Sequence, residues 1–148
     1  MRPVLQSFAI DPDADTVAVF QALATLNLQI RNEGESVPTL LRKAALEHGL
    51  GDYAAERSST EHALALQPGH REALYRRALA CIGLALVRSG HAEGHNLPTK
   101  PARITEHPVF WLDEAAYSLK RILLDGDDPE ARAVLADVHD LIKEAMPK

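Results

Sequence analysis

The amino-acid sequence predicts an all-α protein of about six helices. Among its 148 residues 46% are apolar, only 5% are aromatic, and Ala and Leu dominate, a composition that favours helices over strands. Apolar residues recur three and four positions apart in several stretches, as on one face of a helix. Clusters of Gly, Pro and Asp separate these stretches, as turns do. The length is that of a single domain with a core of its own, which we expect over residues 1–148.

The first predicted helix covers residues 12–32. The acidic residues of "IDPDADT" supply helix caps and favourable first-turn charge. Apolar positions then follow at helical spacing: Val17, Phe20, Leu23, Ala24, Leu26 and Ile30. The stretch "NEGES" ends this N-terminal helix.

Two further helices are expected before residue 70. Ser36 is a predicted N-cap, and Pro38 is tolerated in a first helical turn, where its missing N–H costs little. Gly49 and Gly51 end this helix, since glycine takes the left-handed conformation that helix C-termini favour. The next helix follows Asp52 and stops at "QPGH", because proline disfavours a helical conformation in the residue before it.

The second half of the chain contains a long predicted loop between helices. The helix of "REALYRRALACIGLALVRS" precedes residues 90–108, which hold three prolines, two glycines and three histidines without apolar periodicity. After this loop "VFWLDEAAYSLKRILL" is amphipathic again, and "DGDD" is a turn. A final helix is predicted over residues 129–146, opening with a proline.

Residues 37–70 resemble a tetratricopeptide repeat (TPR), a pair of antiparallel helices. Leu40 occupies the large apolar position of its first helix, and Ala44 and Ala63 occupy the small positions. "GDY" stands at the turn, and Pro68 ends the second helix. The resemblance implies helical hairpins stacked into an array, with the N-terminal helix as an extra element.

A second, looser repeat begins at Arg71 and extends over residues 71–128, interrupted by the loop 90–108. Leu74 and Ala78 match the large and small positions of the first repeat. The helix 129–146 is then the capping helix. One position departs from the pattern: Glu56 stands where the family has a small alanine, which questions how closely the helices pack there.

The TPR resemblance implies a non-catalytic scaffold or adaptor that holds a protein or peptide in an apolar groove. Its inward positions, transferred to this chain, are Leu41, Ala45, His48, Tyr75, Arg76, Leu79 and Ile82. A chaperone carboxylate clamp is not expected, because the positions that require Lys or Asn hold Leu, Tyr and Ala. Two alternatives stay open: the N-terminal helix fills the groove, or a second copy of the chain pairs with it as a homo-oligomer.

The net charge of −5 and the pI near 5.8 argue against nucleic acid and anionic membranes as partners. Acidic residues follow the N-terminus where a signal peptide would carry its cleavage site, so a cytoplasmic protein is expected. No cofactor is predicted. The single cysteine, Cys81, lies in an apolar run and is predicted to be core.

The loop 90–108 carries the alternative function, a metal-binding protein or metal-dependent enzyme. Imidazole and carboxylate groups suit zinc, nickel or copper, and the candidate ligands are His91, Glu93, His95 and His107. The run "HAEGH" is not the "HExxH" zinc motif, and surface histidines without a ligand role are the other interpretation. No phosphate-binding loop or nucleophile elbow occurs in the sequence.

Two further clusters have a structural and a functional interpretation. Arg71, Arg76 and Arg77 are either a solvated helix face with stabilising pairs to Glu72 or a docking site for an acidic peptide. Trp111 is predicted to lie in the core. The functional interpretation is that it is exposed and anchors an interface with a partner. Its expected core neighbours are Phe110, Leu112, Ala115, Ala116 and Leu119.

Overall fold

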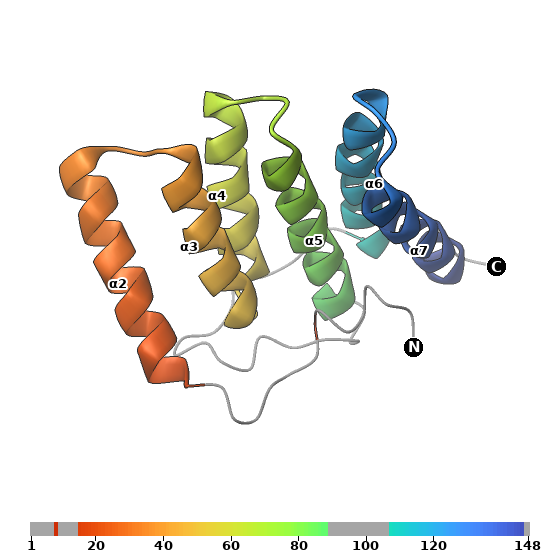
Figure 1. Ribbon diagram of the computed structural model, residues 1–148. Helices are drawn as coiled ribbons and strands as arrows, with labels where there is room; N and C mark the ends of the chain where they lie inside the picture. The colour runs from red at the N-terminus through yellow and green to blue at the C-terminus, as the bar shows by residue number, and fades with distance from the viewer. Residues whose placement is uncertain (1–7, 9–14, 89–106, 147–148) are drawn as a thin grey trace.

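The computed structural model describes residue 8, residues 15–88 and residues 107–146. Within these residues it contains six α-helices and no strand (Figure 1). The helices are α2 (Thr16–Glu33), α3 (Val37–Gly49), α4 (Tyr53–Leu66), α5 (Arg71–Arg88), α6 (Pro108–Leu124) and α7 (Pro129–Ala145). The prediction of an all-α protein of about six helices is therefore confirmed.

The caps fix where the first two helices begin and end. Asp15 accepts a hydrogen bond from the Ala18 N–H at 3.0 Å, so α2 begins at Thr16 and not at residue 12 as predicted. Ser36 caps α3 as expected, and it forms a reciprocal capping box with Thr39.

Of the two glycines predicted to end the helix α3, Gly49 is still helical. Gly51 takes the left-handed conformation, with φ of 76°, and glycine adopts this conformation without steric cost. The chain then re-enters a helix at once, because Asp52 caps α4 by accepting from the Ala55 N–H at 3.2 Å.

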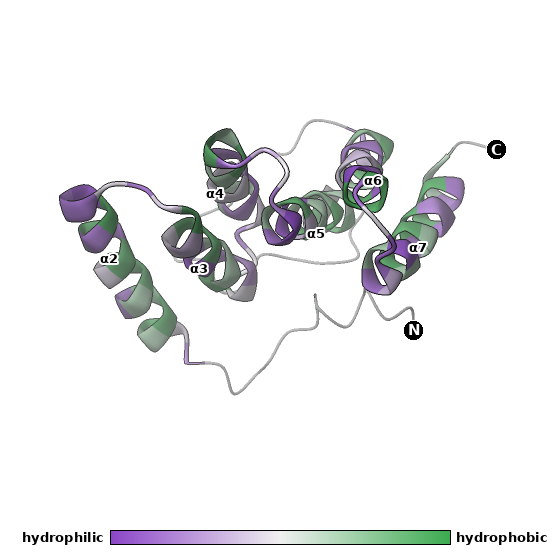
Figure 2. Ribbon diagram, turned by 45° about the horizontal axis from the view of Figure 1, so that its top comes forward, coloured by the Kyte–Doolittle hydropathy of each residue, from purple (hydrophilic) through white to green (hydrophobic). Residues whose placement is uncertain are grey.

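Each helix from α3 onward packs against the next one in the sequence, and α3 also contacts α5. Figure 2 shows α4 and α6 on one side of this array, α3 and α7 on the other, and α5 between them. The helix α2 stands at the end of the array and packs more loosely, against α3. Of the residues of α2 only Leu26 is buried, and Val17 is 66% exposed.

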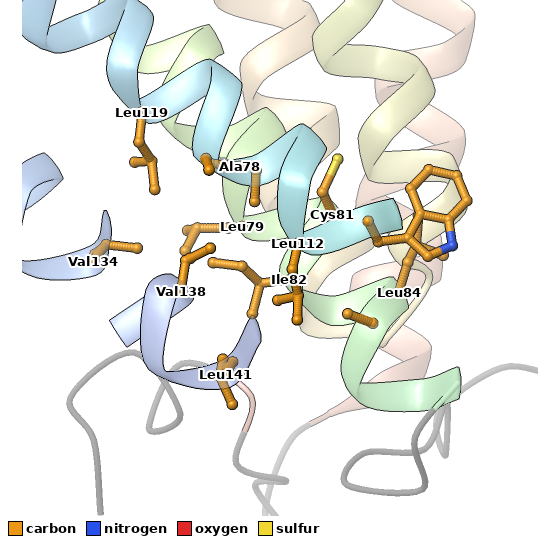
Figure 3. Packing of buried hydrophobic residues seen from close by; sticks show 14 of the residues in the cluster. Ala78, Leu79, Cys81, Ile82, Leu84, Leu112, Leu119, Val134, Val138 and Leu141 are labelled. Carbon is orange, nitrogen blue, oxygen red and sulfur yellow. The ribbon is translucent and has the colours of Figure 1, made fainter. Parts of the chain in front are cut away.

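The core centres on α5, where every residue from 78 to 86 is buried. Leu112 and Leu119 of α6 and Val138 of α7 pack against it (Figure 3). Cys81 is fully buried, as predicted, and burial raises the pKa of its thiol to about 11. It is therefore a core thiol and a poor nucleophile at neutral pH.

The predicted core residues of α6 are buried at every position except one. Trp111 is buried with 6% exposure, and Leu112, Ala115, Ala116 and Leu119 are core as expected. Phe110 was expected in the core as well, but it is 45% exposed. Consecutive residues of a helix point in different directions. In α6 the side chain of Trp111 faces the core, and that of Phe110 does not.

The helices α4 and α5 lie in close contact at Gly83. A Cβ atom at this position would lie 2.4 Å from the ring of Tyr53, so only glycine allows the ring to lie against the backbone of α5. No helix among the described residues is long and apolar enough to cross a membrane.

Candidate functional site

The seven residues predicted to line a groove divide into two groups. Leu41, Ala45 and His48 of α3 and Tyr75 and Arg76 of α5 are all partly exposed, and α3 contacts α5. We call the surface of these five residues the α3–α5 face.

The other two predicted residues, Leu79 and Ile82, are not on the surface. They are 6% and 0% exposed and lie in the core beside Val138 and Leu141 of α7 (Figure 3). Their assignment to an open groove is corrected by this burial: the apolar positions of the second half of α5 pack against the final helix and leave no surface for a partner.

A buried carboxylate joins two residues of the α3–α5 face. Glu56 of α4 is 0% exposed, and both of its oxygens are hydrogen-bonded to His48 Nδ1, at 2.9 and 3.1 Å. Arg76 Nη1 lies 3.8 Å from the same carboxylate. The carboxyl group of Glu56 therefore lies where α3, α4 and α5 meet and contacts a side chain from each of the other two helices.

The protonation of Glu56 depends on opposing effects. Burial raises its pKa, because the charged form loses its hydration, whereas His48 and Arg76 lower the pKa by stabilising that form. A protonated His48 donates to the ionised carboxylate, and a protonated Glu56 donates to a neutral imidazole, so either arrangement keeps the hydrogen bond.

A second buried carboxylate, Glu47, lies between α3 and α4. It is 6% exposed, accepts a hydrogen bond from Ser59 Oγ at 2.7 Å, and has Lys43 Nζ at 3.9 Å. Burial raises its pKa to about 7. Two glutamates with raised pKa values thus lie in the first hairpin, α3–α4.

An aromatic cluster adjoins this face at His48. The ring centroid of Phe8 lies 5.1 Å from that of His48 and 5.4 Å from that of Tyr53, and Phe8 is only 8% exposed. Sequence reasoning assigned no role to Phe8. The only signal was a large aromatic residue in "LQSFAI", ahead of the first helix and outside any periodic pattern.

Tyr75 lies against Arg71, four residues earlier on α5. The Arg71 guanidinium lies 4.7 Å above its ring, and the same group binds both oxygens of Asp128, at 2.7 and 3.1 Å. Arg71 also binds Glu130 at 2.7 Å. One arginine therefore joins the beginnings of α5 and α7 and covers one side of the Tyr75 ring.

The arginine cluster agrees in part with the solvated helix face that the sequence suggested, because Arg71 and Arg76 each lie 3.7 Å from a carboxylate oxygen of Glu72. Arg77 is 13% exposed and donates to Glu114 at 3.0 Å and Ser118 at 2.9 Å, so it is not part of a solvated face. Arg71 and Arg76 also pair with carboxylates of the chain itself. The cluster presents little unpaired charge to an acidic peptide.

Three of the four candidate metal ligands, His91, Glu93 and His95, lie outside the described residues. The fourth, His107, caps α6, where its Nδ1 accepts from the Val109 N–H at 3.1 Å. In the part of the chain that the structure describes, no three His, Cys, Asp or Glu residues are grouped so that they could hold a metal ion.

Comparison of the chain with models of known protein families, with curated proteins and with solved structures found no match.

Proposed function

We propose that this protein is a non-catalytic scaffold of TPR type that binds a protein or peptide partner on the α3–α5 face. The proposal is supported by the order of packing, in which consecutive hairpins stack and α3 meets α5. Ala44 and Ala63, the two small positions of the first repeat, are both 0% exposed, as close helix packing requires. In keeping with the sequence, we propose that the protein acts in the cytoplasm.

The observation that carries the proposal is the burial of Phe8. This side chain precedes the helical array, yet it loses nearly all its exposure against His48 and Tyr53. Burial of an aromatic ring in such a cluster stabilises by about 2 kcal/mol. The same contacts are available in principle to an aromatic side chain of another chain, which would have to replace Phe8.

The chemistry of the face favours an apolar anchor over a charged one. Leu41, Ala45 and Tyr75 offer partly exposed apolar surface. Arg76 pairs with Glu56 and Glu72 of the same chain, so it contributes orientation more than attraction. The expected partner is therefore a segment with aromatic or aliphatic side chains at helical or alternating spacing.

The test is selection of peptides from a displayed random library on the full-length protein, followed by fluorescence anisotropy with the selected peptides. We expect an aromatic anchor in the selected sequences. The Tyr75→Ala variant should weaken binding about tenfold, because tyrosine is enriched among interface hot spots. The Phe8→Ala variant should strengthen binding, since it vacates the aromatic cluster.

The matched control is Leu124→Ala, which removes an apolar side chain that is 79% exposed on α6. Binding that responds equally to Leu124→Ala and Tyr75→Ala, or a library that yields no binder, would contradict the proposal. A particle size that grows with protein concentration and shrinks in Tyr75→Ala would identify a second copy of the chain as the partner.

A further inference from the structure

A hollow lies between α4 and α6, on the side of the array away from α3. It has a volume of about 410 Å³ and is lined by residues of α4, α5 and α6, among them Leu64, Leu74, Tyr117 and Arg121. We call it the α4–α6 groove. It is separate from the α3–α5 face, because none of the five residues of that face lines it.

The groove has an apolar base and an exposed aromatic rim. Leu74 is 5% exposed and Leu64 is partly buried, and Pro68 adds an apolar ring at one end. Tyr117 on α6 is 67% exposed. Large apolar side chains exposed around a hollow are typical of sites that bind a side chain of a partner.

Two of the charged residues in the groove are already compensated. Glu61 lies 3.1 Å from Arg57 and 3.4 Å from Arg77. Arg77 in addition binds the Glu114 carboxylate at 3.0 Å. These groups neutralise one another and attract no further charge.

The remaining charge is that of Arg121. Its carboxylate partner is Asp125, the C-cap residue of α6, at 3.4 Å, and the two side chains are 39% and 61% exposed. An exposed pair of this kind contributes little. Arg121 can therefore exchange Asp125 for a carboxylate brought by a ligand, and its planar group can bind both oxygens of that carboxylate.

We propose that the α4–α6 groove binds a peptide segment in which an acidic residue stands next to a leucine-like or aromatic side chain. The apolar side chain lies on Leu64 and Leu74, beneath Tyr117, and the carboxylate binds Arg121. This site goes beyond the function proposed above and does not depend on it.

The test is a two-dimensional ¹H–¹⁵N NMR titration of the full-length protein with two matched peptides. One is acetyl-Ala-Leu-Glu-Leu-Ala-amide, and the other has Gln in place of Glu. We expect saturable shifts at Leu64, Leu74 and Tyr117 with the Glu peptide and affinity at least about threefold lower for the Gln peptide. The Arg121→Gln variant should bind both peptides equally and weakly.

The control variant is Arg132→Gln, which removes an exposed arginine of α7 that pairs with Asp127 and does not line the groove, and it should leave both affinities unchanged. Tyr117→Ala tests the rim separately. Equal binding of the two peptides, no loss in Arg121→Gln, or absence of shifts at the groove residues would overturn the proposal. Shifts confined to Leu41 and Tyr75 would also overturn it, while supporting the α3–α5 face.

Discussion

The two central hairpins, α3–α4 and α5–α6, are packed by different chemistry. The described residues include five buried polar or charged side chains, and four of them are in the first hairpin: Glu47, Glu56, Ser59 and Thr60. The second hairpin contains only Ser118 in this class and is otherwise filled by Leu, Ile, Ala, Cys and Trp side chains. The first hairpin thus buries ionisable side chains between its helices, whereas the second is packed almost without them.

This difference predicts that the hairpins respond differently to pH. Burial of apolar surface does not depend on protonation, whereas a buried carboxylate changes its contribution wherever its folded and unfolded pKa values differ. Residues of the α3–α5 face, His48 and Arg76, contact one of these carboxylates. A change of pH should therefore reach the proposed binding face through the first hairpin and not through the second.

The largest effect is expected in the apolar hairpin. Leu119 is 0% exposed in the cluster between α5, α6 and α7, so Leu119→Ala should lower the free energy of unfolding by about 4 kcal/mol through lost burial and the cavity left behind. Urea denaturation measures this, with the exposed Leu124→Ala as the control. The loss should be the same at acidic and neutral pH. A pH-dependent loss would show that the apolar hairpin is coupled to the ionisable one.

The next effect is expected at the buried carboxylate. Glu56→Ala leaves His48 and Arg76 without their shared acceptor, and we expect a loss of about 3 kcal/mol. Glu56→Gln retains the volume and one acceptor oxygen and should cost about half as much. If Glu56→Ala were as stable as the parent protein, the contacts of Glu56 with His48 and Arg76 would not stabilise the hairpin.

The sequence predicted the helices well because their signals are local. The capping by Ser36, the turn at Gly51 and the burial of Ala44 and Ala63 depend on residues within a few positions of each other or on one periodic face. The sequence likewise identified Glu56 as a departure from the repeat.

The partners of Glu56 could not be predicted, because His48 and Arg76 belong to two other helices and meet it only after packing. The prediction that Leu79 and Ile82 line a groove was wrong for a related reason. A periodic pattern shows which side of a helix is apolar, but it does not show whether another helix or solvent covers that side. The helix α7 covers the apolar side of α5, whereas on α2 the apolar side chain of Val17 is 66% exposed.

The smallest effect is the one that most sharply tests the difference between the hairpins. Glu47 has an ordinary pKa of 4.5, and burial raises the folded value to about 7. Below the lower value both states hold the proton and the stability is fully present. As the pH rises from 4.5 to about 7 only the unfolded chain releases the proton, so the stability falls, and above the folded pKa the loss is complete.

Glu47→Gln cannot ionise and should lack this fall. A shift of this size corresponds to about 3 kcal/mol, and this net value already includes the contacts of the ionised carboxylate with Ser59 and Lys43. The weaker hydrogen bond that Ser59 makes with the Gln amide offsets about 1 kcal/mol. The variant should therefore be about 2 kcal/mol more stable than the parent protein near pH 8 and slightly less stable near pH 4. Urea melts of both proteins across this range measure the difference, with Ser118→Ala as the control from the second hairpin. Parallel profiles of the variant and the parent would mean that Glu47 ionises normally, and the first hairpin would then be no more sensitive to pH at this position than the second.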